Sequence, residues 1–244
     1  MIIILGSTHD DILYFESVMT NRHDETLFDK YPLEYGTIFN QEVVLVYDVF
    51  TSYTSGIITS YLLQKHFVVL VIAVGKCVAY SSDFKAGDIA IATSVIFGDV
   101  NQTKEANSQL GQIPHLPKEL PASDEVITYL EQSLEKRSFS RHDQALFVSS
   151  NSIYDMIDRY KHLVMNENIF GRKDKVVFDC ISGGAFLAAT LYNIPVVGIK
   201  VVEKKVNEKS TVDNYINVLK QYSGVGRAVV TCIGDIGRND IMRG

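Results

Sequence analysis

The sequence predicts an α/β protein in which helices flank a mixed, mainly parallel central sheet. Short runs rich in Val and Ile alternate with helical patterns along most of the chain. Runs that are apolar at every position are typical of strands covered on both faces, as in parallel sheets. The chain has 244 residues, of which 46% are hydrophobic, so it is long enough to bury a large core. We therefore expect a single domain over residues 1–244, built as a three-layer sandwich.

Seven segments are predicted as strands because each is short, β-branched and bounded by turn residues. In chain order they are IIIL at 2–5, EVVLVYDVF at 42–50, FVVLVIAV at 67–74, DIAIATSVIF at 88–97, ALFVSS at 145–150, KVVFD at 175–179 and PVVGIKVV at 195–202. Six segments are predicted as helices from apolar residues at helical spacing. They are residues 10–19, 54–66, 123–136, 152–165, 183–192 and 211–236. In the last segment, Gly224 and Gly226 weaken the helical pattern.

Two polar segments interrupt this alternation. Residues 101–122 contain three of the five prolines, and residues 21–37 form a shorter segment of the same kind. Long excursions of this type are usually functional loops or solvated insertions. We therefore expect loops in both places.

Composition excludes several classes of partner. The net charge of -6 and the pI near 5.5 give no basic surface for nucleic acid or an anionic membrane. No run approaches membrane-spanning length, and MIIILG is predicted as a first strand because it lacks the basic flank of a signal peptide.

Cys77, Cys180 and Cys232 are widely spaced, which favours free thiols in a reducing compartment. We expect a cytoplasmic protein. Because no metal, cofactor or serine-hydrolase motif is present, we expect neither a metal nor a cofactor.

Polar residues at strand ends are the candidate site residues, because ligands of parallel α/β sheets bind beyond the carboxyl ends of strands. GSTHDD at 6–11 follows the first strand, where Asp10 and Asp11 could face a ligand or stabilise the first turn of a helix. Lys76 follows a later strand and could meet an anion or lie on the surface. Asp179 could accept hydroxyl groups of a ligand or cap the next helix. Glu203 lies beside two lysines and could belong to the site or to a solvated charge run.

These segments resemble, in order and spacing, the purine nucleoside phosphorylase and uridine phosphorylase superfamily. The resemblance is carried by GSTHDD, by VGKCVAYSSDFKAGDIAIAT at 74–93, by ALFVSSNSIY at 145–154 and by VVFDCISGGAFLAATLYNIPVVGIKVVEKK at 176–205. Within the superfamily it is closest to the methylthioadenosine/S-adenosylhomocysteine nucleosidases. It implies a nucleoside phosphorylase-like fold and hydrolysis of the N-glycosidic bond of a purine, methylthioadenosine-like nucleoside.

The resemblance also implies a role for each matching residue. Asp11 matches the acid that orients the attacking water. The acid that protonates the base falls on Lys204, and a shift of one residue would let Glu203 serve instead. Ile181 takes the place of the carboxylate that grips the ribose, and its side chain accepts no hydrogen bond. The implied substrate-binding set is Ser7, Gly75, Ile153, Tyr154, Asp179, Cys180 and Ile181.

Two other functions stay open from the sequence. A catalytically silent, nucleoside-binding homologue is favoured by Ile181 and by the side chains of residues 76–79, where the family has Ser-Ala-Gly-Gly. A nucleoside phosphorylase is a further alternative, although phosphate-binding arginines have no match around Gly6 or Ser55. The resemblance implies a homodimer whose partner completes the pocket near residues 101–122.

Overall fold

The computed structural model describes residues 1–80, 83–104, 106–136, 141–151, 175–206 and 208–238. Within these ranges the strands form one sheet in the order β2-β3-β4-β1-β5-β11-β6-β10-β9-β7-β8. The strands are β1 (Ile2–Leu5), β2 (Thr20–Leu27), β3 (Tyr31–Ile38), β4 (Gln41–Val46), β5 (Leu70–Ala73), β6 (Lys76–Ala79), β7 (Ile89–Phe97), β8 (Leu120–Pro121), β9 (His142–Ser149), β10 (Val176–Asp179) and β11 (Val196–Lys205). Parallel and antiparallel pairs both occur, which confirms the predicted mixed α/β fold.

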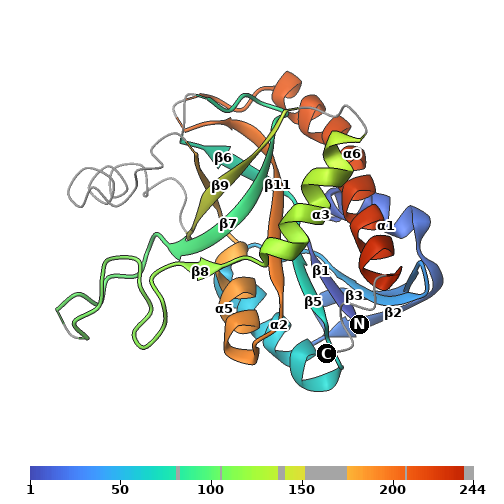
Figure 1. The fold of residues 1–244 in the computed structure, drawn as a ribbon, viewed down its shortest axis with the longest axis horizontal. Helices are drawn as coiled ribbons and strands as arrows, with labels where there is room; N and C mark the ends of the chain where they lie inside the picture. The colour runs from blue at the N-terminus through green and yellow to red at the C-terminus, as the bar shows by residue number, and fades with distance from the viewer. Residues whose placement is uncertain (81–82, 105, 137–140, 152–174, 207, 239–244) are drawn as a thin grey trace.

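The helices flank this sheet in two groups (Figure 1). They are the short 3-10 helix η1 (His9–Asp11), α1 (Leu13–Val18), α2 (Ser52–Lys65), α3 (Asp124–Glu135), α5 (Ser182–Tyr192) and α6 (Val212–Arg238). Helix α6 packs against α1 and α3, whereas α2 packs against α5. Local chemistry sets the helix ends: the Thr51 side chain caps α2, and Asn193 ends α5 in the left-handed conformation.

Strand β11 joins the two parts of the sheet. Its first residues pair with β5, and its last residues pair with β6. It also pairs with β7, so that β11, β6, β10, β9 and β7 form a closed ring. Strands β1 and β5 are parallel neighbours and fully buried, as their unbroken apolar sequences predict. The turns that follow β1 and β5 therefore lie at the same edge of the sheet.

The prediction of a loop at residues 21–37 is wrong. Most of this segment forms the hairpin of β2 and β3, with β2 at the edge of the sheet. Strand β2 is exposed over nearly its whole length and is rich in polar residues, a composition that protects an edge from unwanted pairing but hides the strand from an apolar search. Residues 101–104 and 106–119 belong to the long connection from β7, which projects from the sheet and leads into β8 (Figure 1).

The predicted helices at 54–66, 123–136 and 183–192 are confirmed to within about two residues at each end, as expected for helix boundaries. The helix predicted at 10–19 instead begins as η1 and continues as α1. Helix α6 runs without a break through Gly224 and Gly226. The helix predicted at 152–165 lies outside the described residues. Among those described, no helix is long and apolar enough to cross a membrane.

Candidate functional site

Asp11 is held rigidly at the carboxyl end of β1. Its Oδ2 atom accepts hydrogen bonds from the backbone N–H groups of Ser7, at 2.7 Å, and Thr8, at 2.9 Å. The carboxylate therefore caps the turn and also points into the molecule, where the residue is 5% exposed. Its other oxygen, Oδ1, is buried and makes no direct hydrogen bond to a described residue. A buried carboxylate oxygen of this kind is suited to accept a hydrogen bond from water or from a ligand.

Gly75 is pressed against this carboxylate from the end of β5. It has a φ of +123°, and a Cβ atom built on it would lie 2.8 Å from Asp11 Oδ2. Any side chain here would collide with Asp11 and would also be strained by the backbone conformation. The glycine thus brings the turn after β5 into contact with the turn after β1.

Glu203 lies in an irregularity of β11. Val202 pairs with Cys77 and Lys204 pairs with Val78, so Glu203 is the extra residue of a β-bulge. Bulges change the direction of a side chain and are frequent beside active sites. Glu203 Oε2 is 3.2 Å from Lys76 Nζ, and the Glu203 side chain is 14% exposed. Lys76 is therefore the ion-pair partner of a candidate site residue.

Asp179, at the end of β10, is a buried member of an ion pair. Its Oδ2 atom lies 3.1 Å from Lys200 Nζ, and each side chain is 1% exposed. The same oxygen accepts hydrogen bonds from the backbone N–H and the hydroxyl group of Ser182, which confirms that Asp179 caps the next helix. Lys200 also donates to the carbonyl of Val74, at 3.1 Å. Asp179 Oδ1 is buried and has no hydrogen-bond partner among the described residues.

The rest of the turn after β10 packs against α2. Ile181 is completely buried in the core. The carbonyls of Cys180 and Ile181 accept hydrogen bonds from the hydroxyls of Ser52 and Ser55. A Cβ atom on Gly184 would overlap the backbone of Ser52. This glycine therefore permits close contact between α5 and α2.

The neighbouring Gly183 packs against the sheet. A Cβ atom on it would lie 2.8 Å from the Phe97 ring and 2.9 Å from Ser149 Cβ. Cys180 is half-buried, and burial followed by the nearby Asp179 charge raises the pKa of its thiol to about 11. The double glycine thus serves packing on two sides of the turn.

Tyr222 lies on α6, a helix that contacts η1, in which Asp11 is the last residue. Burial, and then the charge and hydrogen-bonding interaction of Asp11, raise the pKa of the Tyr222 hydroxyl. Glu203 and Asp10 act in the same direction, which brings Tyr222 within the electrostatic reach of both candidate catalytic carboxylates. Asp11, Gly75, Glu203 and Tyr222 therefore belong to one region of the molecule, although they come from four separate segments.

A separate apolar cavity of about 630 Å³ lies between α2 and α5. Gly56 and Leu187 line its helical walls, and Val100 and Ile113 border it from the connection after β7. Asp11 and Glu203 are absent from its lining. The cavity is therefore distinct from the group of carboxylates.

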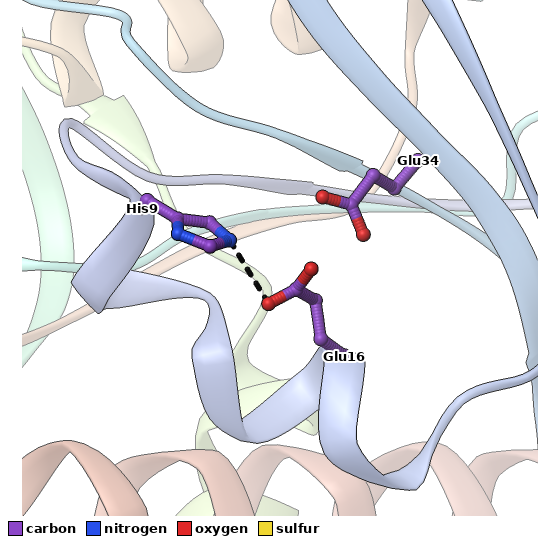
Figure 2. Close-up of side chains that lie close together, drawn as sticks. All are labelled: His9, Glu16 and Glu34. Carbon is purple, nitrogen blue, oxygen red and sulfur yellow. Dashed lines mark ion pairs between the residues drawn. The ribbon is translucent and has the colours of Figure 1, made fainter.

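A second cluster of ionisable side chains joins α1 to the β2–β3 hairpin. Figure 2 shows the His9 ring directed at the Glu16 carboxylate, with Glu34 facing the same space. Their potential ligand atoms lie within 4.8 Å of one another. Arg22 already bridges both carboxylates, at 2.9 Å from Glu16 and 2.8 Å from Glu34. Because this guanidinium already binds an oxygen of each acid, we assign the cluster to the packing of α1 on the hairpin rather than to metal binding.

Comparison with known proteins identifies the family. The family model described as the Phosphorylase superfamily matches residues 2–232. This chain belongs to the Phosphorylase superfamily. A relative in Staphylococcus haemolyticus, named 5'-methylthioadenosine/S-adenosylhomocysteine nucleosidase, is 24% identical over 159 residues, which cover 65% of this chain and 68% of the relative.

Solved structures of other proteins have the same fold. The nucleosidase of Neisseria meningitidis, in complex with methylthio-immucillin-A, has a TM-score of 0.84 at 16% identity, covering 96% of this chain and 98% of that one. The futalosine hydrolase of Helicobacter pylori has a TM-score of 0.82 at 14% identity, covering 96% of this chain and 97% of that one. The fold of a superfamily member therefore does not by itself identify its nucleoside.

The described part of this superfamily member places most of the predicted site residues in two turns at strand ends. The turn after β1 contains Ser7 and Asp11, and Gly75 packs against it. The turn after β10 contains Asp179, Cys180 and Ile181. Ile153 and Tyr154 lie outside the described residues. Sequence reasoning missed Lys200 and Tyr222. A lone lysine within an apolar strand was a usable signal for Lys200, whereas Tyr222 simply continues the helical pattern of residues 211–236.

Proposed function

We propose that this chain is a nucleosidase that hydrolyses the N-glycosidic bond of a purine, methylthioadenosine-like nucleoside. The observation on this chain that carries the proposal is the Asp11 carboxylate, fixed through Oδ2 and with Oδ1 left over to accept a hydrogen bond. The name of the Staphylococcus haemolyticus relative supports the reaction class. The proposed unit is one domain over residues 1–244 that needs no metal or cofactor.

In the proposed reaction the bond between C1′ and the base nitrogen breaks, and its electron pair goes to the base. Water adds to C1′ and gives a proton to Asp11. Glu203 is the proposed acid: because the Lys76 ammonium favours its ionised form, it takes up a proton from water before each turnover and passes that proton to the departing base. The bulge at Glu203 supports the shift of one residue by which Glu203 replaces Lys204 in this role. Ser7, Gly75, Ile153, Tyr154, Asp179, Cys180 and Ile181 are the proposed substrate-binding residues.

A specific observation favours the alternative of a silent, nucleoside-binding homologue. Asp179 Oδ2 is already engaged by Lys200 and Ser182, and Ile181 is fully buried. Neither side chain then offers an accessible carboxylate to the ribose hydroxyls. The two functions differ in turnover, so an assay of base release separates them.

The test uses a panel of purine and pyrimidine nucleosides that includes 5'-methylthioadenosine, with and without phosphate, and measures free base by chromatography. Release without phosphate supports the nucleosidase, and release only with phosphate supports a phosphorylase. Binding without release supports the silent homologue. Asp11→Asn should lower the rate by about 100-fold or more. The matched change Asp10→Asn removes a neighbouring charge and should have little effect.

We also propose a homodimer in the cytoplasm. Tyr53, Ile57 and Leu191 line the cavity between α2 and α5 and are 70%, 59% and 60% exposed. A second copy covering this apolar face would remove it from water. The three cysteines are free, in keeping with a reducing compartment. Sedimentation of the wild type against Ile57→Asp tests the dimer: the wild type should sediment as a dimer and the variant as a monomer.

A further inference from the structure

Two serines in the first turn of α2 bind the turn that follows β10. The Ser52 hydroxyl donates a hydrogen bond to the carbonyl of Cys180, at 2.9 Å. The Ser55 hydroxyl donates one to the carbonyl of Ile181, at 2.7 Å. Residues three apart on a helix lie on the same face, so both hydroxyls reach the same turn. Ser52 is 5% exposed and Ser55 is 0% exposed, so water does not compete for either bond.

The hydrogen bonds of Ser52 have a definite direction. A hydroxyl group has one proton, and Ser52 donates its own to the carbonyl of Cys180. The hydroxyl of Ser149, 3.1 Å from that of Ser52, therefore donates to it. Ser149 in turn accepts a hydrogen bond from the backbone N–H of Gly183, at 2.8 Å. The chain from Gly183 through Ser149 and Ser52 thus begins and ends in the turn after β10.

Other contacts fix the start of α2 itself. The backbone N–H of Ser52 donates to Asn151 Oδ1, at 2.9 Å, and Asn151 Nδ2 donates to Asp99 Oδ2, at 2.9 Å. Helix α5 lies directly on this part of α2, because Gly184 has no side chain that would overlap the Ser52 backbone. The two serines are therefore held in place by the rest of the fold, and the turn after β10 is held by the serines.

Cys180 is the residue of this turn that has surface to offer a ligand. Asp179 and Ile181 are 2% and 0% exposed, whereas Cys180 is half-buried. The carbonyl that Ser52 binds belongs to Cys180, and the next carbonyl along the chain is bound by Ser55. Because these bonds fix the backbone on which the Cys180 side chain stands, they also fix the direction of that side chain.

We propose that Ser52 and Ser55 are positioning residues, whose hydroxyls fix the turn after β10 and so hold the Cys180 side chain against the bound nucleoside. The inference rests on the proposed nucleosidase function and extends it to the first turn of α2. The two hydroxyls act through the turn and not through contact with the substrate. They favour binding because the turn does not have to be ordered when the nucleoside arrives.

The first test is kinetic and uses Ser52→Ala and Ser55→Ala. Each change removes one hydrogen bond to the turn and should raise KM for 5'-methylthioadenosine about 3-fold to 10-fold, with kcat little changed. A role in stability alone would lower the amount of active enzyme, and with it the apparent kcat, at constant KM. Unchanged KM values in both serine variants overturn the proposal.

Thr59→Val is the matched control for both serine variants. Thr59 is 0% exposed and lies one helical turn beyond Ser55, but its hydroxyl has no hydrogen-bond partner among the described residues. The change therefore removes a buried hydroxyl of α2 without removing a bond to the turn. It should leave KM unchanged, and a rise in KM as large as that of Ser55→Ala overturns the proposal.

A second measurement does not depend on turnover. Cys180 is alkylated with iodoacetamide at a fixed alkaline pH, and the rate is measured by mass spectrometry. Loss of a bond to the turn should expose the thiol more often, so Ser52→Ala should be labelled about 3-fold to 10-fold faster than the wild type. Thr59→Val should be labelled at the wild-type rate. Equal rates in the wild type and both serine variants overturn the positioning of Cys180.

The same labelling separates this proposal from the proposed function. Bound 5'-methylthioadenosine should slow the alkylation of Cys180 in the wild type, and a lack of protection overturns the contact between Cys180 and the nucleoside. Absence of base release by the wild type overturns the nucleosidase instead. Protection of Cys180 without base release then supports the silent homologue, and faster labelling of the serine variants still supports their positioning of the turn.

Discussion

Replacing Lys200 with Met should strongly destabilise the protein, because it leaves the Asp179 carboxylate buried without its counter-ion. The two charged groups are 3.1 Å apart and each is 1% exposed. With an effective dielectric constant of about 20, their attraction is about 5 kcal/mol. Removal of one partner of a buried pair generally costs about 3–5 kcal/mol. The carbonyl of Val74 would lose its hydrogen bond to Lys200 as well.

A surface ion pair of this chain provides the control. Lys175 Nζ lies 2.8 Å from Asp143 Oδ1, closer than the buried pair, but the two side chains are 49% and 25% exposed. Because solvent screens this pair, Lys175→Met should cost about 0–1 kcal/mol. Distance alone would rank the two variants in the opposite order, so the comparison isolates the effect of burial.

The assay is equilibrium unfolding in urea, followed by circular dichroism, for both single variants. The double variant Lys200→Met, Asp179→Asn removes both charges and should recover part of the loss. If Lys200→Met costs no more than Lys175→Met, or if the double variant is less stable than Lys200→Met, the attribution to a buried ion pair is wrong.

Three further predictions concern packing, reactivity and capping. Gly226→Ala should lower the free energy of unfolding by about 1–3 kcal/mol, because the new methyl group would overlap the Tyr14 ring; an unchanged urea midpoint would contradict this. The pKa of the Cys180 thiol is raised to about 11, so the thiol is almost fully protonated at pH 7. Its alkylation by iodoacetamide, measured by mass spectrometry, should therefore accelerate as the pH rises towards 11. Fast labelling at pH 7 would refute this prediction. Thr51→Ala removes the side-chain cap of α2 and should cost about 1 kcal/mol in urea unfolding, whereas Thr51→Ser should cost less.

Much of the fold could be predicted because apolar runs report burial directly. The strands at 2–5 and 175–179 are fully buried along their observed lengths, and their sequences are apolar up to the final acid of the second. The hairpin at 21–37 was missed because β2 is an exposed edge strand, stabilised by pairing with β3 rather than by its own composition. The residue pattern of one segment does not show which other strand will pair with it.

The candidate site was predictable only where local chemistry sets it. The acid at position 11 and the glycine at position 75 follow strands, and ligands of parallel sheets bind where strands end. The ion-pair partner of Glu203 could not be read from its sequence neighbours, Lys204 and Lys205. It is Lys76, which the parallel pairing of β6 with β11 brings alongside.

The sequence by itself determined the class of fold, the family resemblance and the acid at the end of the first strand. The periodicity of apolar residues, the apolar runs of buried strands and the polar residues at strand ends are local properties, so they can be recognised in the sequence. Tertiary structure decided that Asp179 pairs with Lys200, that Gly226 lets α6 approach α1, and that Lys76 pairs with Glu203. These contacts join residues far apart in the chain, and the packing of the whole domain sets the distances between them.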